Sequence, residues 1–298
     1  MILIADSGST KTSWCLIDFS GKTLNFDTEG YNPCYAGCKT LIEILRPNLP
    51  ENFDPTDVQQ VAFYGAGVFD DKHKVIYDDL HPVFPNAHID VSIDLIGSAR
   101  ALLGHDAGFV AIVGTGSSSC LYDGEKIIHK ISSLGFMLGD EGGGGYMGKR
   151  LITDYIRGHM PKEVRDCFWD TFQLSAVQLI ERIYANPLPN RYCASFTTFL
   201  TGKYAGHEYL EQQIICGSFR DFFNRVVKYY PNYQSYSFNC VGSIGWIFRD
   251  YLTLVASEFG METGIIISSP MEGLVNYHLQ GNYFSIGVRT MLRNDTLP

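Results

Sequence analysis

A pattern that occurs twice constrains most strongly what this chain can fold into. Each copy consists of an apolar run, a stretch rich in Gly, Ser and Thr, a second apolar run and a tight turn. In the first copy these four segments are 2–5, 6–12, 14–17 and 18–21. In the second copy they are 109–113, 114–119, 120–122 and 123–124. Each copy predicts a β-hairpin with a polar tip and a third strand after it. Because small residues let backbone N–H groups surround an anion, two such tips facing each other could clamp a polyphosphate.

The composition is that of a soluble globular chain. Its 298 residues are 45% hydrophobic and 18% charged, which predicts roughly two domains with substantial cores. A net charge of -9 argues against nucleic acid or an anionic membrane as the main partner. The apolar run before Asp6 is too short for a signal peptide, and no run approaches the ~20 residues that span a bilayer. We therefore expect a cytoplasmic protein.

Cysteine usage agrees with that compartment. Eight cysteines are scattered along the chain, with Cys34 and Cys38 as the close pair. A zinc or iron–sulfur site needs tighter or matching pairs, so reduced thiols are the preferred interpretation.

Segments outside the two copies alternate between strand-like and helix-like patterns. This alternation predicts an α/β layer in which parallel strands extend each hairpin. No low-complexity linker separates the two halves of the sequence, which favours domains that share a hinge and a cleft.

Two standard nucleotide loops are absent from the sequence. Lys11 lacks the glycine that precedes the lysine of a P-loop. Gly114-Thr115-Gly116 leads into a strand-like segment, whereas a dinucleotide fingerprint opens a helix.

Two aspartates end strand-like segments. Asp6 would repel a phosphate unless a divalent cation lay between them, so it predicts Mg²⁺ bound through water; a turn-stabilising aspartate is the alternative. Asp94 precedes a helix and is either an N-cap or a carboxylate that accepts a proton from an attacking hydroxyl.

Two glycine-rich stretches in the second half predict binding sites. Asp140 and Glu141 head the run Gly139–Gly145, where carboxylates suit sugar hydroxyls and four consecutive glycines are costly to order. A binding role is preferred over a flexible loop. Gly242 and Ser243 follow a buried strand and could present backbone to a flat ligand such as adenine.

Taken in this order, these motifs resemble the sugar kinase and actin-like ATPase superfamily. Within it they look most like the N-acetylglucosamine kinases and the related BadF/BadG/BcrA/BcrD ATPase family. Residues 6–12 are similar to the first phosphate motif, 114–117 to the second, and 139–142 to the sugar-site segment. Ser133-Leu134-Gly135 departs from the family, because many members have Trp between two glycines there.

The resemblance implies an α/β fold with two ribonuclease H-like (actin-like ATPase) domains. Each would be a mixed sheet flanked by helices, with a nucleotide cleft between them. The implied domains are 1–104, on which a C-terminal helix at about 278–298 could pack back, and 105–277, with a helical insertion at about 160–232.

The resemblance also implies ATP-dependent phosphorylation of an amino sugar, with the 6-hydroxyl of N-acetylglucosamine as the expected acceptor, Asp94 as base and Mg²⁺ near Asp6. The implied contacts are Gly8, Ser9, Thr10, Lys11, Thr12, Gly114, Thr115, Gly116 and Ser117 for phosphate, Gly242 and Ser243 for adenine, and Asn32, Asp94, Thr115, Gly116, Asp140 and Gly144 for sugar. An ATPase that drives an electron-transfer or dehydratase partner, and a non-catalytic sugar sensor, stay open. So does a homodimer.

Overall fold

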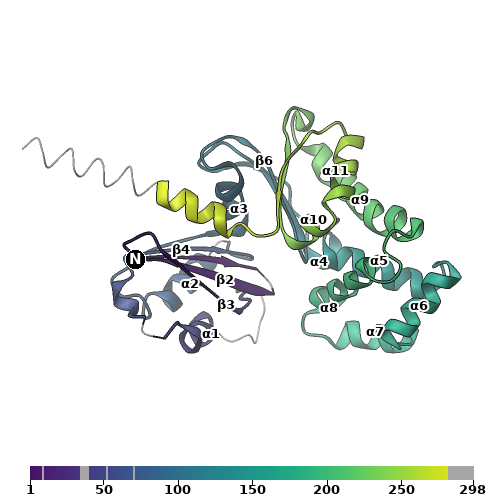
Figure 1. Ribbon diagram of the computed structural model, residues 1–298, viewed down its shortest axis with the longest axis horizontal. Coiled ribbons are helices and arrows are strands. Elements are labelled where there is room, and N and C mark those ends of the chain that lie inside the picture. The colour runs from purple at the N-terminus through teal and green to yellow at the C-terminus, as the bar shows by residue number, and fades with distance from the viewer. Residues whose placement is uncertain (9, 34–39, 52, 70, 281–298) are drawn as a thin grey trace, which may run out of the picture. The chain divides into compact units, whose positions relative to one another are not determined.

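The chain divides into two units, and the first is assembled from both ends of the sequence (Figure 1). Unit 1 contains Met1–Asp106 and the chain from Pro270 onward, whereas unit 2 is the continuous stretch Ala107–Ser269. The computed structural model describes residues 1–8, 10–33, 40–51, 53–69 and 71–280. The boundary after Ser269 lies earlier than the one expected after residue 277, and most of the C-terminal helix expected at about 278–298 lies outside the described residues.

Unit 1 is built on a mixed sheet with helices on both faces. Among the described residues its sheet has five strands, β1 (Ile2–Ser7), β2 (Lys11–Ile17), β3 (Thr23–Glu29), β4 (Gln60–Gly65) and β5 (His88–Ile93). Its helical segments include α1 (Leu41–Leu45), α2 (Lys72–Leu80), α3 (Asp94–Leu103), the 3₁₀ turns η1 (Arg46–Asn48) and η2 (Pro55–Asp57), and a helix over residues 271–280.

Unit 2 combines a second mixed sheet with a long helical insertion. Its described strands are β6 (Gly108–Val113), β7 (Ser117–Tyr122), β8 (Ile127–Lys130), β9 (Phe238–Val241) and β10 (Thr263–Ile267). Its helices are α4 (Gly135–Leu138), α5 (Gly144–Arg157), α6 (Lys162–Phe172), α7 (Ala176–Ala185), α8 (Pro189–Ser195), α9 (Gly217–Arg225), α10 (Ser243–Ile247) and α11 (Arg249–Glu258). Shorter helical segments are the 3₁₀ turns η3 (Phe196–Thr201), η5 (Val227–Tyr229) and η6 (Tyr233–Ser235) and the π-helix η4 (Leu210–Cys216).

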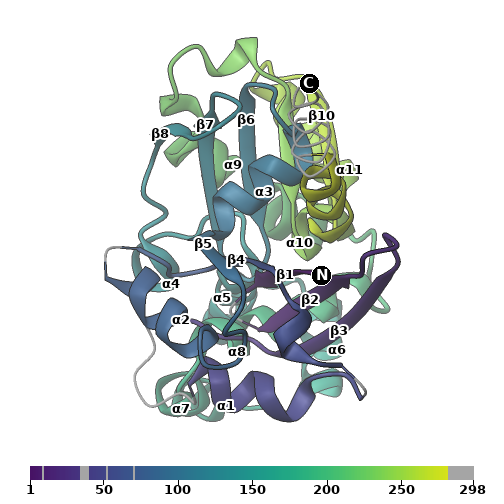
Figure 2. The ribbon, with the colours of Figure 1, turned by 90° about the vertical axis from the view of Figure 1, so that its left-hand side faces the viewer.

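The two sheets have the same topology, which is the structural counterpart of the repeated sequence pattern. The strand order is β3-β2-β1-β4-β5 in unit 1 and, read from the corresponding edge, β8-β7-β6-β9-β10 in unit 2. In both sheets the first three strands pair antiparallel and the last two add in parallel. Figure 2 shows β8, β7 and β6 side by side. The predicted mixed sheets flanked by helices are confirmed.

Alternation along β1 sends side chains to opposite faces of the sheet in unit 1. Leu3 joins the core that α1 and α2 cover. Ile4 joins a smaller core that contains Leu274 from the helix over residues 271–280 and lies against α3. Figure 1 shows these two pairs of helices on opposite sides of the sheet. Since side chains alternate with period two, Asp6 points to the same side as Ile4, toward α3.

An aromatic core fixes the elements of unit 2. The rings of Phe109 and Phe238 on neighbouring strands have centroids 5.5 Å apart, and Phe223 of α9 lies 5.1 Å from Phe238. The same core includes Met147 and Leu151 of α5. The buried face of α5 holds this helix against the core, so the N-terminus of α5 has a fixed position within unit 2.

The lengths of the helices and the state of the cysteines complete the description of the fold. No helix in the described part of the chain is long and apolar enough to cross a bilayer. Within that part, free thiols are found at Cys15, Cys120, Cys167, Cys193, Cys216 and Cys240. The close pair Cys34 and Cys38 lies outside the described residues.

Gly148 of α5 is expected to resist substitution, because a Cβ there would overlap the backbone carbonyl of Cys193 in α8. Alanine gains about 1 kcal/mol of helix propensity over glycine, whereas overpacking a core costs about 1–3 kcal/mol. A backbone carbonyl cannot rotate away, so the overlap should dominate. We expect Gly148→Ala to lower the free energy of unfolding in urea by roughly 1 kcal/mol or more.

Thr153→Ala is the matched control on the same helix, because the Thr153 hydroxyl bonds back to the Lys149 carbonyl within the helix, at 2.7 Å. This variant should stay within about 0.5 kcal/mol of the parent. An unfolding curve for Gly148→Ala that coincides with the control would contradict the packing argument.

Candidate functional site

In unit 1, the carboxyl ends of three parallel strands meet at one edge of the sheet. Ser7 of β1 is in register with Gly65 of β4, and Gly65 is in register with Ile93 of β5. The residues that follow these positions therefore lie together: the hairpin tip after Ser7, the loop after Gly65, and Asp94 after Ile93. Ligand sites in open α/β sheets are found outside such an edge.

The first hairpin tip is closed by backbone hydrogen bonds. Gly8 N–H donates to the Lys11 carbonyl at 3.0 Å, and Gly30 N–H donates to the Thr10 carbonyl at 3.2 Å. A Cβ on Gly30 would lie 2.6 Å from the Gly8 carbonyl oxygen, so the chain at residue 30 lies directly against the tip. Ser9, one of the expected phosphate ligands, lies outside the described residues.

Two side chains of the tip are already engaged within the hairpin. The Thr12 side chain is fully buried, and its hydroxyl lies 2.8 Å from that of Ser7. The Thr12 hydroxyl therefore takes part in hairpin packing, and its contact with phosphate stays a prediction. Lys11 is exposed, and its Nζ lies 3.2 Å from a carboxylate oxygen of Asp27. A phosphate would have to compete with Asp27 for this cation.

Asp6 and Asp94 form the acidic centre of this edge. Burial and, after it, the nearby Asp94 carboxylate raise the pKa of Asp6 to about 7, while Lys11 opposes the shift. Asp94 is the first residue of α3, and Ile93 occupies the N-cap position. The N-cap alternative for Asp94 is therefore not what the structure shows, although its Oδ1 accepts a 2.8 Å hydrogen bond from Leu95 N–H.

Asn32 lies against the loop that follows β4. Gly67 in this loop has φ +75°, and a Cβ on it would overlap Asn32 Oδ1. The Ala66 N–H donates to the Ser7 carbonyl at 2.9 Å, which fixes the loop to the end of β1. Unit 1 thus brings the tip, Asn32, Asp6 and Asp94 to one edge.

The donor set in unit 1 fits a Mg²⁺ ion that is held partly by its substrate. In the described part of the chain, no group of three or more His, Cys, Asp or Glu side chains could hold a metal ion. Mg²⁺ commonly takes one or two carboxylates and completes its shell with water and substrate phosphate. Asp6 offers a carboxyl group of this kind beside Asp94, and a bound cation would favour its ionised form.

In unit 2, the second phosphate-like loop is attached to the start of α5. Gly144 N–H donates to the Gly114 carbonyl and Gly145 N–H to the Thr115 carbonyl, both at 2.8 Å. A Cβ on Gly143 would lie 2.7 Å from the backbone carbon of Gly116. The glycine run thus permits close packing of two backbones. Gly144 is buried and its N–H is bonded, so it helps to shape the loop, and its contact with sugar stays a prediction.

Asp140 lies beside the same loop. It has φ +56°, and its Oδ1 accepts from Ser117 N–H at 3.4 Å. A Cβ on Gly116 would lie 2.7 Å from Asp140 Oδ2, so the missing side chain at 116 makes room for this carboxylate. Burial raises the pKa of Asp140 to about 6, with the bond from Ser117 opposing and Glu141 adding to the shift.

Glu141 belongs to the run predicted to bind sugar, but its pairing with Arg225 was not predicted. The Glu141 side chain is buried, and its Oε1 lies 3.6 Å from Arg225 Nη1 on α9. This pair joins the acidic loop to the helical insertion. No local signal in the sequence indicates Arg225 as the partner of Glu141.

Gly242 and Ser243 lie next to the phosphate-like loop. Gly242 has φ +131°, and a Cβ on it would overlap the Val113 carbonyl and lie 3.1 Å from Gly114 N. Gly242 N–H donates to the Ile267 carbonyl at 2.9 Å, and Ser243 begins α10. Unit 2 therefore groups both expected nucleotide segments, 114–117 and 242–243, with Asp140.

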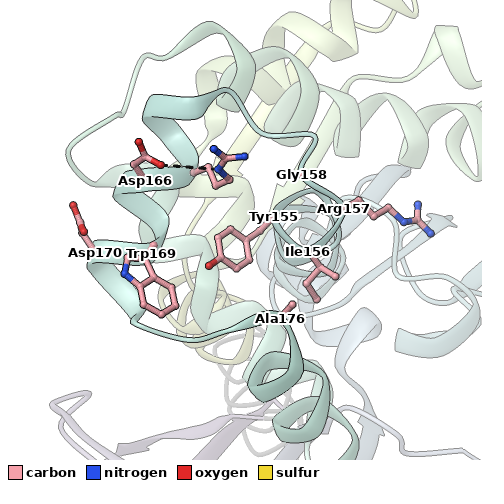
Figure 3. Close-up of a pocket in the computed structure, with 9 residues that line it drawn as sticks. Tyr155, Ile156, Arg157, Gly158, Asp166, Trp169, Asp170 and Ala176 are labelled. Atoms are coloured by element: carbon pink, nitrogen blue, oxygen red, sulfur yellow. Dashed lines mark ion pairs between the residues drawn. The ribbon is translucent and has the colours of Figure 1, made fainter.

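A pocket of about 590 Å³ lies elsewhere in unit 2, between the end of α5, α6 and α7 (Figure 3). Tyr155, Trp169 and the ion-paired Asp166 are among its lining residues. It contains none of the residues expected to bind nucleotide or sugar, so we do not include it in the site.

Proteins similar to this chain are found among solved structures. No family model matches the chain, and no curated protein matches it. Two solved structures, from Porphyromonas gingivalis and Chromobacterium violaceum, are each named as a putative N-acetylglucosamine kinase. The first is 36% identical with a TM-score of 0.83, and the match covers 93% of this chain and 98% of that one. This chain belongs to the N-acetylglucosamine kinase-like family of sugar kinases.

More distant structures agree in fold. The protein from Chromobacterium violaceum is 17% identical with a TM-score of 0.69, covering 93% of this chain and 98% of that one. A ROK family glucokinase from Streptomyces griseus, solved with glucose and AMPPNP, is 13% identical with a TM-score of 0.57, covering 93% and 97%. These likenesses show the actin-like ATPase fold. The predicted fold class and the assignment to the ATP-dependent sugar kinases are confirmed at the level of the family.

Asp140→Asn should stabilise the unliganded protein at pH 8. A carboxyl group with a pKa raised to about 6 favours the folded state at low pH, and this contribution is lost as pH rises through about 6. The neutral amide avoids that loss and can still accept the bond from Ser117. We expect a higher unfolding temperature than the parent at pH 8, with the difference shrinking as pH falls from about 6 toward 4. A pH-independent difference in calorimetry would show that burial of the charge is not the cause.

Proposed function

We propose that this protein transfers the γ-phosphoryl group of ATP to the 6-hydroxyl of an amino sugar, with N-acetylglucosamine as the favoured substrate. The observation that carries the proposal is the position of Asp94. Its carboxyl group stands at the sheet edge beside Asp6 and the hairpin tip, where the register of β1, β4 and β5 brings them together. Membership in the sugar kinase family supports this choice of reaction.

Asp94 acts as the base in this proposal. It accepts the proton of the sugar hydroxyl as the oxygen attacks the γ-phosphorus, and the bond from that phosphorus to the bridging oxygen of ADP breaks. Asn32, which lies at the same edge of unit 1, binds the sugar and orients this hydroxyl. Because phosphoryl transfer depends mainly on positioning and charge neutralisation, the fixed register of the strands contributes directly.

The hairpin tip of unit 1 holds phosphate in this proposal. The small residues Gly8 and Thr10 leave room for a phosphate at the tip, and Lys11 offers a cation. When bound, Mg²⁺ would neutralise phosphate charge and would be held near Asp6 through water.

Unit 2 supplies a second set of ligands. The loop 114–117 offers backbone N–H groups and hydroxyls to phosphate, and Gly242 and Ser243 lie beside it to take the adenine. Asp140 accepts hydrogen bonds from sugar hydroxyls. Its pKa of about 6 leaves it largely ionised at pH 7 and above, as this role requires.

Asp94→Asn should reduce kcat for sugar phosphorylation by about 10²–10⁴-fold, because the amide cannot take the proton. ADP release with N-acetylglucosamine as acceptor measures the effect. Asp18→Asn is a matched control in unit 1, since Asp18 sits in an exposed turn and accepts from Ser20 and Lys22 N–H, bonds that an amide oxygen can keep. Equal rates for Asp94→Asn and the parent would overturn the proposed base.

The acceptor hydroxyl can be tested with a panel of sugars. N-acetylglucosamine, N-acetylmannosamine, glucosamine and glucose should differ in ADP release, with N-acetylglucosamine highest. The 6-deoxy form of N-acetylglucosamine should bind and give no phosphorylated product, because it lacks the attacking oxygen. Phosphorylation of the 6-deoxy sugar would refute the position.

The two other classes of function predict different results in the same assays. ATP hydrolysis that no sugar stimulates, with a coloured protein after anaerobic purification, would favour an ATPase that drives an electron-transfer partner. Sugar binding without ADP release would favour a sensor.

A further inference from the structure

A buried polar cluster in unit 1 lies directly beneath the helix that carries Asp94. Tyr64 lies on β4, is 1% exposed and is paired in register with Asp6 on β1. The hydroxyl of Tyr64 lies 2.8 Å from Arg100 Nη1 on α3 and 2.9 Å from His278 Nε2 on the helix over residues 271–280. One phenol thus connects the central sheet to both helices on that face.

Contact between the ring of Tyr64 and α3 is unusually close. A Cβ on Gly97 would lie 2.7 Å from Cγ of Tyr64, so α3 rests on the ring without an intervening side chain. Glycine inside a helix costs about 1 kcal/mol relative to alanine, and the close contact accounts for its presence here. Asp94 is one helical turn before Gly97, so the position of the ring fixes the height of Asp94 above the sheet.

The hydrogen bonds of the cluster have a defined direction. Arg100 can only donate, so the Tyr64 oxygen accepts from it and the single phenolic hydrogen is left for His278. His278 must then present an unprotonated Nε2. Burial, aided by Arg100, lowers the pKa of His278 to about 4, which keeps the ring neutral at physiological pH. Arg100 therefore donates to the Tyr64 oxygen, and the Tyr64 hydroxyl donates to Nε2 of His278.

Further contacts hold the two helices in this arrangement. Arg100 Nη1 lies 3.7 Å from an Asp90 carboxylate oxygen on β5, and its guanidinium lies 5.2 Å from the ring centroid of Tyr277. A Cβ on Gly273 would overlap the Ala101 carbonyl, so the helix over residues 271–280 packs directly against α3. α3 is thus fixed at the Tyr64 ring and again near its C-terminal end.

We propose that Tyr64 is a positioning residue, which holds Asp94 at its working distance from Asp6 through the hydrogen bonds that join Arg100, Tyr64 and His278. The proposal rests on the proposed function, because it takes Asp94 to be the base. Tyr64 itself is buried and acts through α3. A small displacement of a reacting group is enough to slow a reaction about 10²-fold, so the loss of one buried hydroxyl can be visible in kcat.

Tyr64→Phe keeps the ring under Gly97 and removes the hydroxyl. We expect kcat to fall about tenfold or more, with the KM values for ATP and sugar within about twofold of the parent. Tyr122→Phe is the matched control, because Tyr122 is equally buried and its hydroxyl donates to the Gly124 carbonyl in unit 2. Its kcat should equal that of the parent. Equal kcat values for Tyr64→Phe and Tyr122→Phe would overturn the positioning role.

A double-mutant cycle with Asp94→Asn separates positioning from a general loss of fold. If Tyr64 acts through Asp94, then adding Tyr64→Phe to Asp94→Asn causes no further fall in kcat. A further fall by the same factor as in the parent would overturn the proposal. Asp94→Asn alone tests the proposed function, because a kcat equal to that of the parent would show that Asp94 is not the base. If Asp94→Asn is slow and Tyr64→Phe is as fast as the parent, only the positioning role is refuted.

Variants at His278 keep the test decisive even if Tyr64→Phe does not fold. His278→Gln retains an acceptor for the Tyr64 hydroxyl and should keep most of the kcat. His278→Leu has similar bulk without an acceptor, and it should reproduce the tenfold fall. Equal kcat values for these two variants would also overturn the proposal.

Discussion

The meeting of strand ends at one edge of each sheet is the constraint on which the rest of the structure depends. In unit 1, Asp94 and the hairpin tip follow strands that end in register. In unit 2, Gly114 and Gly242 follow β6 and β9, which also end side by side. The same topology therefore brings strand ends together twice, and the residues that follow these ends can carry functional groups without disturbing the sheet.

Close approach between backbones is the second device that both units share. Gly30 allows the chain before Asn32 to lie on the hairpin tip, and Gly143 allows the start of α5 to lie on the loop at 116. A side chain at either position would push apart segments that carry functional groups. The glycines thus act on geometry, and the groups that touch a ligand are their neighbours, such as Asp140.

The repeated pattern was enough to predict the two hairpins and their polar tips, because period-two alternation and turn chemistry are local properties. The alternation of strand-like and helix-like segments outside the repeat predicted the parallel strands that complete each mixed sheet. Tertiary contacts decided the rest. The burial of Thr12 against Ser7 and the pairing of Glu141 with Arg225 depend on partners distant in space or sequence, which local patterns do not encode. The bond from Gly144 N–H to the Gly114 carbonyl is a further contact of this kind, because a glycine run by itself is compatible with both binding and packing.

The assembly of unit 1 from both ends of the chain has a consequence for biosynthesis. Unit 2 is continuous and can complete its core as soon as Ser269 has left the ribosome. Unit 1 cannot, because Leu274 and His278 belong to the face that contains Tyr64. Until they emerge, that apolar face lacks part of its cover, and a nascent chain in this state is open to chaperones and to misassembly. The order of synthesis thus makes the helix over residues 271–280 a late addition to unit 1.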